Sequence, residues 1–178
     1  MDYLSGGPDV AIKSLGQGIS EAFLVSAKKG AAKFENVLRQ FLSNGRSFKF
    51  TEHLCSFILD QNFADMGVKS VGLVCERVRD LKRRDSPELP DLSDKLIIGF
   101  QKVPDFIPGV GKIEMQASKV SFRIGKNCPF KDSAATFFTA AVREINGLVD
   151  AVHPEAGAGV ISAGEEDILL GALSERII

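Results

Sequence analysis

The spacing of the hydrophobic residues changes once along the chain, and this change restricts the folds that the sequence can adopt. Before residue 85, apolar side chains recur every three or four positions, which is typical of helices with one buried face. The run DSPELPDLSD over residues 85–94 contains two prolines and cannot continue a helix. Beyond it, apolar side chains alternate with others, as they do in half-buried strands. The sequence therefore predicts an α+β fold.

The predicted architecture has four consecutive parts within a single domain of residues 1–178. A chain of 178 residues, of which 44% are hydrophobic and 25% charged, suits one compact globular unit. Because a small sheet cannot bury a core alone, we expect the helices to cover it. The parts are a helical part at 8–84, a connector at 85–94, a small β part at 95–131 and C-terminal helices at 132–178.

Four helices are predicted in the helical part, from apolar stripes and from residues that favour helix ends. Pro8 suits a first helical position, Asn44 and Gly45 suit a helix stop, and Thr51 can cap a helix. The fourth helix repeats the apolar spacing of the others. The predicted ranges are 8–27, 31–43, 51–63 and 66–84.

The β part is expected to form an antiparallel sheet of two or three strands. Leu96, Ile98 and Phe100 share one face of a first strand, and residues 113–117 form another. The inward positions then change from odd to even at residues 118–119, which we interpret as a bulge or a tight hairpin. So small a sheet has uncovered edges, which must be covered or must pair with another subunit.

Two helices are predicted after the sheet. The first is capped by Asp132, has a broad apolar face and ends near Val152. The small residues of 156–164 predict a flexible connector. Ser162 and Glu165 match a capping box, a pair of side chains that satisfies the first backbone N–H groups of a helix, so they predict the start of the last helix.

The cysteines and the apolar runs indicate a compartment. Cys55, Cys75 and Cys128 are odd in number and widely spaced, which is a poor basis for a disulfide framework, so we interpret them as buried thiols in a reducing environment. No apolar run approaches the ~20 residues that span a bilayer, and the first ten residues lack the regions of a signal peptide. We expect a cytoplasmic or nuclear protein that is not secreted and has no membrane span.

No motif in the sequence defines a metal or phosphate site. His53 and Cys55, the nearest pair of metal ligands, would point in different directions on a helix. The glycine-lysine runs at residues 108–112 and 123–127 lack the spacing of a Walker loop. The acidic residues 165–167 suit the first turn of a helix, where negative charge is favoured. We expect no metal ion and no cofactor.

A nucleophilic enzyme needs a base beside a serine or cysteine, and the chain has two histidines. Cys75 or Cys128 beside His153 remains an alternative, although a histidine near a helix end is also favoured there by the helix dipole. We therefore expect no catalytic residue.

The basic end of the fourth predicted helix is the charged feature with a functional interpretation. Arginine and lysine side chains on such a helix end can contact a phosphate backbone. The alternative is a solvated helix end, because Asp80 lies three and four residues before two of the arginines. The candidate nucleic-acid-binding residues are Arg77, Arg79, Lys82, Arg83 and Arg84.

The charge of the chain is unevenly distributed. The formal net charge is −1, so the protein lacks the overall positive field of many nucleic-acid-binding proteins. Residues 28–84 nevertheless carry a net charge of +6, residues 112–131 carry +4, and residues 144–178 carry −6. Such surfaces can attract each other within one chain or between copies of the chain.

The sequence favours a non-enzymatic structural or interaction protein that associates with its own copies and binds RNA or another polyanion through the basic helix. Viral structural and accessory proteins often have this size and kind, so by analogy we interpret the chain as viral. Recognition by base stacking is not favoured, because 13 Phe stand beside one Tyr and no Trp.

The alternative function is a small apolar-ligand carrier or an enzyme. Its Phe-rich pocket would lie between the sheet and the helix that begins at Asp132, under a loop at residues 102–112. Phe106 and Ile107 discriminate between the two functions. Burial of these side chains over a cavity favours the carrier, whereas protrusion favours an interface.

Overall fold

The structure is a computed structural model that describes residues 21–81, 89–107, 111–112, 114 and 116–177. Contacts divide the chain into two units, residues 1–41 and residues 42–178. The helix α2 (Glu21–Leu42) is the element described in the first unit. It confirms the helix predicted at 31–43 and continues through Gly30, whereas most of the helix predicted at 8–27 lies outside the described residues. The expected single domain stays a prediction.

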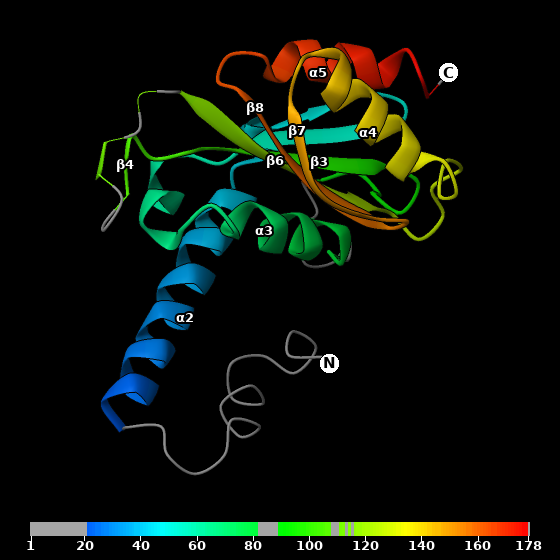
Figure 1. Cartoon of the computed structure of the whole chain (residues 1–178). Helices are drawn as coiled ribbons and strands as arrows, with labels where there is room; N and C mark the ends of the chain where they lie inside the picture. Colours follow the sequence, from blue (N-terminus) through cyan, green and yellow to red (C-terminus); the bar gives the residue numbers. More distant parts are fainter. Residues whose placement is uncertain (1–20, 82–88, 108–110, 113, 115, 178) are drawn as a thin grey trace. The chain divides into compact units, whose positions relative to one another are not determined.

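The second unit is built on a six-stranded mixed sheet, with α3 (Ser70–Arg79) on one face and α4 (Ala134–Glu144) and α5 (Glu166–Ser174) on the other (Figure 1). β2 and β3 are parallel, and the other neighbouring strands are antiparallel. The strands, in their order across the sheet, are β1 (Phe48–Phe50), β2 (Leu54–Ile58), β3 (Leu96–Lys102), β6 (Ala117–Ile124), β8 (Ala156–Ser162) and β7 (Leu148–His153). The α+β class is confirmed, whereas the sheet of two or three antiparallel strands is wrong.

The smaller elements connect this framework. Two short 3-10 helices, η1 (Gly45–Ser47) and η2 (Gln61–Met66), flank the first two strands. A two-stranded hairpin of β4 (Phe106–Ile107) and β5 (Gly111–Lys112) lies between β3 and β6 and is not part of the main sheet.

The third predicted helix, at residues 51–63, is wrong, because this segment forms β2 and part of η2. Thr51 does accept a hydrogen bond from the backbone N–H of Leu54 through its hydroxyl, but the bond closes a turn instead of starting a helix. The run LCSFI is buried on both sides from Leu54 to Phe57, since β2 lies between β1 and β3. A strand buried on both faces is continuously apolar and lacks the alternation that distinguishes strands from helices.

The long helix predicted from Asp132 to Val152 is also wrong in its second half. α4 ends at Glu144, Asn146 has a left-handed φ of 57°, and the chain returns as β7. The connector predicted at 156–164 is the buried strand β8. Its small residues let β8 lie close to its neighbours: a Cβ atom on Gly157 would come within 2.4 Å of the Phe122 ring.

β6 is a regular strand that pairs with β3 and β8 along its whole length. No bulge or hairpin occurs at residues 118–119, so that interpretation of the odd-to-even change is wrong. The hairpin precedes this strand, and residues 113 and 115, which carried the odd positions, lie outside the described residues.

The two faces of the sheet carry different cores. On the α4 and α5 face, Phe100, Phe122 and Phe138 are fully buried together with aliphatic residues of β3, β6, α4 and α5. These side chains occupy the space in which the carrier hypothesis places a pocket. On the other face α3 packs closely on β3, because a Cβ atom on Gly99 would lie 2.7 Å from the Sγ atom of Cys75.

The buried side chain of Gln101 connects the start of α3 to the sheet. Its amide oxygen accepts hydrogen bonds from the Ser70 hydroxyl at 2.8 Å and the Val71 N–H at 3.2 Å. Its amide nitrogen donates to the carbonyl oxygens of Phe63 and Gly67, each at 3.2 Å. Gln101 is 3% exposed, so these four bonds satisfy its polar atoms where water is excluded.

We expect Gln101→Leu to lower the free energy of unfolding by about 3 kcal/mol, because several buried donors and acceptors lose their partner. Urea denaturation monitored by circular dichroism measures the change. Gln116→Leu, at an exposed position, is the matched control and should stay within about 0.5 kcal/mol of the wild type. Equal losses in the two variants would contradict the role assigned to Gln101.

Candidate functional site

A groove of about 510 Å³ lies on the α3 face of the sheet. α3 packs over β3 and β6, so β8 and β7 are not covered by it. Small apolar residues of these strands, Ala151, Ala156, Gly157 and Ala158, form the floor of the groove, and Val68 and Gly72 lie on its α3 side. We call this feature the α3 groove. Its volume falls in the range of pockets that hold small ligands.

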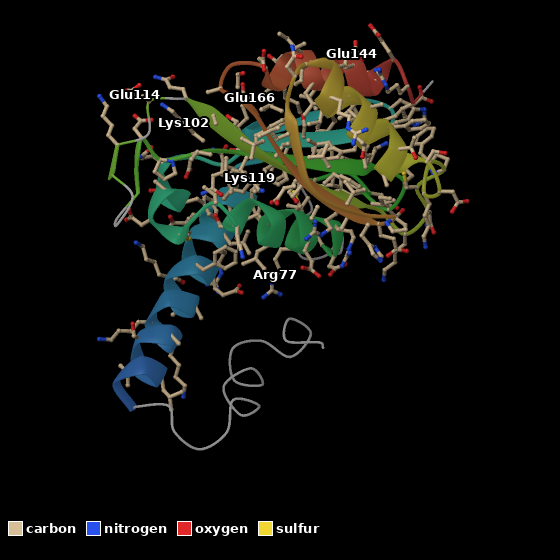
Figure 2. All side chains as sticks on the ribbon, viewed as in Figure 1. Arg77, Lys102, Glu114, Lys119, Glu144 and Glu166 are labelled. Atoms are coloured by element: carbon tan, nitrogen blue, oxygen red, sulfur yellow. The ribbon has the colours of Figure 1, made fainter. Side chains whose placement is uncertain are left out.

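Three basic side chains line the α3 groove. Lys119 and Arg123 come from β6, where alternation places them with Ser121 on the α3 side of the sheet, and Lys69 precedes α3. The Lys119 side chain is only 13% exposed, and its Nζ atom lies 2.5 Å from Oδ2 of Asp150 on β7. Figure 2 shows Lys119 between the sheet and α3. The groove therefore combines an apolar floor with a net positive rim.

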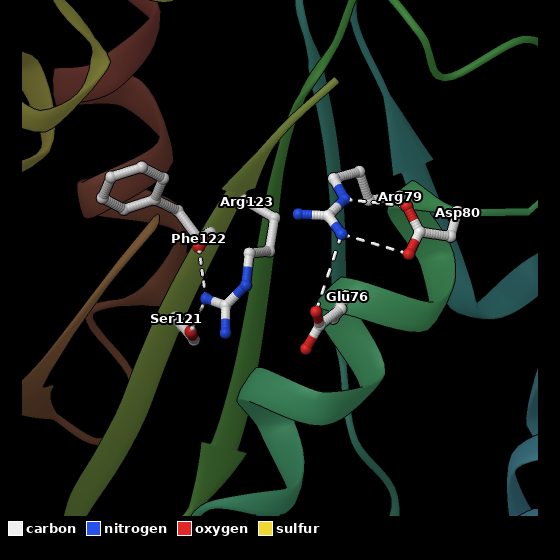
Figure 3. A network of polar contacts seen from close by, with 6 residues as sticks. All are labelled: Glu76, Arg79, Asp80, Ser121, Phe122 and Arg123. Atoms are coloured by element: carbon white, nitrogen blue, oxygen red, sulfur yellow. Dashed lines mark hydrogen bonds and ion pairs between the residues drawn. The ribbon is translucent and has the colours of Figure 1, made fainter. Parts of the chain in front are cut away.

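The Arg123 guanidinium is oriented by its own strand (Figure 3). Its Nη1 atom donates to the carbonyl oxygen of Phe122 at 2.8 Å and to the hydroxyl of Ser121 at 3.3 Å. Its Nη2 atom would lie 3.6 Å from a Cβ atom on Gly72, so the guanidinium is beside α3. In the described part of the chain no carboxylate pairs with Arg123. Since a guanidinium has five N–H donors, Arg123 keeps donors for a ligand.

An irregularity in β7 places an acidic group in the same groove. The pairing of β7 with β8 shifts between Val149 and Ala151, so Asp150 is the extra residue of a bulge. A bulge places two successive side chains on one side of a sheet, so Asp150 and Ala151 both reach the groove, and His153 follows two residues later by alternation. The hydrogen bond from Lys119 and its charge lower the pKa of the Asp150 carboxyl, and Lys69 adds to this effect.

Of the residues predicted to bind nucleic acid, Arg79 is held by neighbouring acids. Its Nε and Nη2 atoms donate to the two carboxylate oxygens of Asp80 at 2.9 and 3.1 Å, and Glu76 lies 3.6 Å away (Figure 3). The hydrogen bonds to Asp80 raise the pKa of Arg79. Arg79 therefore has the salt-bridged role that was the alternative for the helix end.

The other predicted basic residues are not brought to the α3 groove. Arg77 is exposed and points away from the sheet (Figure 2). α3 ends at Arg79, so the fourth predicted helix is confirmed only over part of 66–84. Lys82, Arg83 and Arg84 lie outside the described residues.

The loop at residues 102–112, which was expected to lie over the pocket of a carrier, contains the β4–β5 hairpin. Phe106 pairs with Lys112 and Ile107 with Gly111. This pairing gives the backbone position of Phe106 and Ile107, whereas the burial by which they discriminate between carrier and interface stays a prediction. Among the described residues, no group of three or more His, Cys, Asp or Glu side chains is arranged to hold a metal ion.

The acidic run at the start of α5 makes long-range contacts instead of the predicted capping box. Ser162 and Glu165 are joined through their backbones, and no side chain caps the first N–H groups of α5. The carboxylate of Glu166 accepts from the Ser118 hydroxyl at 2.5 Å and the Gly164 N–H at 2.8 Å. Asp167 pairs with Lys49 at 2.8 Å. These contacts attach the helix start to β6 and β1.

Sequence reasoning missed the residues that line the α3 groove. The signal was present, because Lys119, Ser121 and Arg123 alternate with large apolar residues on one strand and lie in the segment of net charge +4. These three residues form a candidate site only together with Asp150 and Lys69, which are distant in sequence. The partner strand β7 was predicted as helix, so the groove could not be assembled.

Comparisons with known proteins give structural likenesses but no match by sequence. No protein-family model matches the chain, and no curated protein matches it. Among solved structures, the C-Ala domain of alanyl-tRNA synthetase from Aquifex aeolicus is similar, with a TM-score of 0.49 and 6% sequence identity over 73% of this chain and 96% of that one. No helix among the described residues is both long and apolar enough to cross a bilayer.

We expect the carboxyl of Asp150 to titrate below the usual aspartate range, and Lys119→Met to return its pKa upward. The pair stabilises the fold above the ordinary carboxyl pKa, and this contribution is lost as the pH falls through the lowered value. NMR titration of the carboxyl carbon measures both. Lys131→Met is the matched control. Lys131 lies 2.6 Å from Glu155 and lowers its pKa, so this substitution should raise the pKa of Glu155 and leave the pKa of Asp150 unchanged.

The three cysteines are expected to be unreactive in the folded protein. Burial raises the pKa of Cys55 and of Cys75 to about 12, and it also raises the pKa of Cys128. A thiol-disulfide reagent such as Ellman's reagent at pH 8 should therefore label three thiols only after unfolding, because the thiolate is the reactive form. Rapid labelling of one native thiol would instead support a cysteine nucleophile.

Proposed function

We propose that this chain is a non-enzymatic interaction protein that binds RNA in the α3 groove and associates with its own copies. The observation that supports RNA binding is the convergence of Lys69, Lys119 and Arg123 on one groove with a single counter-charge, Asp150. The groove thus concentrates positive charge locally on a chain whose net charge is −1.

The phosphate groups of a bound strand would contact Arg123 and Lys69. Arg123 can offer two parallel N–H donors to a phosphate, because its position is already set by Ser121 and Phe122. A phosphate near Lys119 would compete with Asp150 for the ammonium group, so this contact adds less. Contacts to phosphate carry no base specificity.

The sugar and one base face would contact the apolar floor. The alanine and glycine residues there form a flat surface without an aromatic ring, so bases would pack on it without strong stacking. We therefore expect binding that is sensitive to salt and tolerant of sequence.

The expected result for Lys69→Gln, Lys119→Gln and Arg123→Gln together is a large loss of affinity for a single-stranded RNA oligonucleotide. The slope of log affinity against log salt should also fall by about 2, because three phosphate contacts are removed. Fluorescence anisotropy over a salt series measures both quantities. The melting temperature of each variant, measured in parallel, shows whether it is folded.

Arg77→Gln is the matched control, since Arg77 is a basic residue of the same region that points away from the sheet. It should leave affinity and slope nearly unchanged. If it weakens binding as much as the groove variants do, the basic helix and not the α3 groove contacts the RNA. Absence of any salt-dependent binding by the wild-type protein would reject RNA binding altogether.

The free edges of the sheet are poor surfaces for self-association. β1 has only three residues and includes Lys49, and β7 contains the bulge at Asp150. Short, charged or bulged edge strands are features that prevent pairing between sheets. Association of copies is therefore better explained by the uneven charge of the chain than by strand pairing.

A further inference from the structure

The exposed side of α5 combines acidic groups with an apolar side chain. Asp167, Ile168, Gly171 and Glu175 lie within a sector of about 100° around the helix axis, and all four are exposed. We call this surface the α5 face. Ile168 is 58% exposed, whereas Leu169 and Leu173 on the opposite side of α5 are fully buried in the core. Apart from the exposed ion pair between Asp167 and Lys49, the described residues of the chain therefore leave the α5 face uncovered.

The α5 face and the α3 groove lie on opposite sides of the same sheet (Figure 1). Figure 2 shows the same separation, with Glu166 on the side of α5 and Lys119 toward α3. A chain cannot place its own α5 in its own α3 groove while the sheet separates them. A second copy can do so.

We propose that the α5 face of one copy binds in the α3 groove of another copy. Ile168 would contact the floor of small apolar residues, and Asp167 and Glu175 would face Arg123 and Lys69. The charges and the apolar surfaces of the two sites are thus complementary. The inference rests on the proposed self-association and specifies the surfaces that produce it.

On the α3 face, the strands β8 and β7, over which no described helix packs, offer room for one helix. From β6 to β7 the strands span two intervals, or ~10 Å. Helices that pack side by side have axes ~8–10 Å apart, so a helix over β8 and β7 would lie beside α3 at ordinary packing distance. It would complete a layer of helices on this face, as α4 and α5 do on the other.

The contact that Asp167 already makes does not prevent this binding. The side chain of Asp167 is 78% exposed and that of its partner Lys49 is 66% exposed, so the ion pair is surrounded by water. Exposed ion pairs contribute little free energy and exchange readily. Asp167 can therefore leave Lys49 for a cation of the second copy.

This arrangement joins two different surfaces, so assembly is head to tail. Such an interface forms a ring only if its rotation closes. In an open assembly, each added copy presents a free α3 groove at one end and a free α5 face at the other. The size of the assembly should therefore rise with protein concentration, and it should fall with added salt because charged groups are paired.

Two helical glycines allow each surface to be blocked separately. Gly171→Arg adds bulk and positive charge to the α5 face, and nothing lies within 4 Å of a Cβ atom there. Gly72→Glu adds a carboxylate inside the α3 groove, where a Cβ atom has ordinary contacts with Ser121 Oγ at 3.5 Å and Arg123 Nη2 at 3.6 Å. Gly171→Ala and Gly72→Ala are the matched controls, since they also replace glycine in a helix but add only a methyl group.

Sedimentation velocity at several concentrations of each protein, and of an equal mixture of Gly171→Arg and Gly72→Glu, tests the proposal. We expect the wild type and the alanine controls to assemble, and each blocked variant to be monomeric, with association weakened more than ~10-fold by like charges. The mixture should form a one-to-one dimer, because Gly171→Arg keeps its α3 groove and Gly72→Glu keeps its α5 face.

The proposal is overturned if the mixture stays monomeric, if either blocked variant assembles like the wild type, or if the wild type is a monomer at all concentrations. Wild-type assembly without rescue in the mixture would reject these two surfaces but retain self-association. RNA binding is read separately. Gly171→Arg keeps its α3 groove, so at protein concentrations too low for wild-type assembly it should bind RNA like the wild type.

Discussion

The position of α3 on the sheet depends on one buried amide, that of Gln101. Its four hydrogen bonds join β3 to the end of η2 and to the first turn of α3. Together with the close approach at Gly99, they place α3 over β3 and β6, so no helix of the described residues covers β8 and β7 on this side. The α3 groove exists because α4 packs on β7 and β8 on one face of the sheet. On the other face, α3 packs on β3 and β6 instead. A buried polar group with all its partners is costly to displace, so this asymmetry is stable.

β6 couples the core of the protein to the groove. Its even-numbered residues Val120 and Phe122 are fully buried against α4 and α5, whereas Lys119 and Arg123 point to the opposite face. The same pleat that buries the core therefore holds the two cations in place. Their backbone is constrained, since β6 is paired on both sides. A cation on such a strand loses little side-chain and backbone freedom when it binds a ligand.

The elements that could be predicted from the sequence are those whose periodicity is undisturbed by their neighbours. The strand at Leu96, the helix at 31–43, the start of α4 and the last helix have clear apolar spacing. The segment of β2 was predicted as a helix because both faces of this strand are buried, which removes the alternation of apolar and polar residues. β8 was predicted as a connector because small residues in a sequence resemble a flexible segment. Here Gly157 lies close to the Phe122 ring and Gly159 close to the Leu148 carbonyl oxygen.

The residues that line the α3 groove were not predicted, for a related reason. Arg79 and its neighbours form a conspicuous basic run, but Asp80 and Glu76 on the same helix already bind Arg79. Lys119 and Arg123 are inconspicuous because they are single charges within an apolar strand. Their importance follows from the sheet order, in which β6, β8 and β7 are neighbours although β7 precedes β8 in the chain. Local charge density is therefore a weaker indicator of a site here than charge on a buried strand.

The two ligands that we propose for the α3 groove, RNA and the α5 face of a second copy, would compete for the same cations. In a head-to-tail assembly every copy except the terminal one has its α3 groove occupied by protein. A polyanion that binds a free groove removes that copy from the pool available for growth, so by mass action it shifts the equilibrium toward shorter assemblies. Salt weakens both interactions and cannot select between them, whereas RNA concentration can. If both proposals hold, the single groove makes the state of assembly depend on the concentration of polyanion.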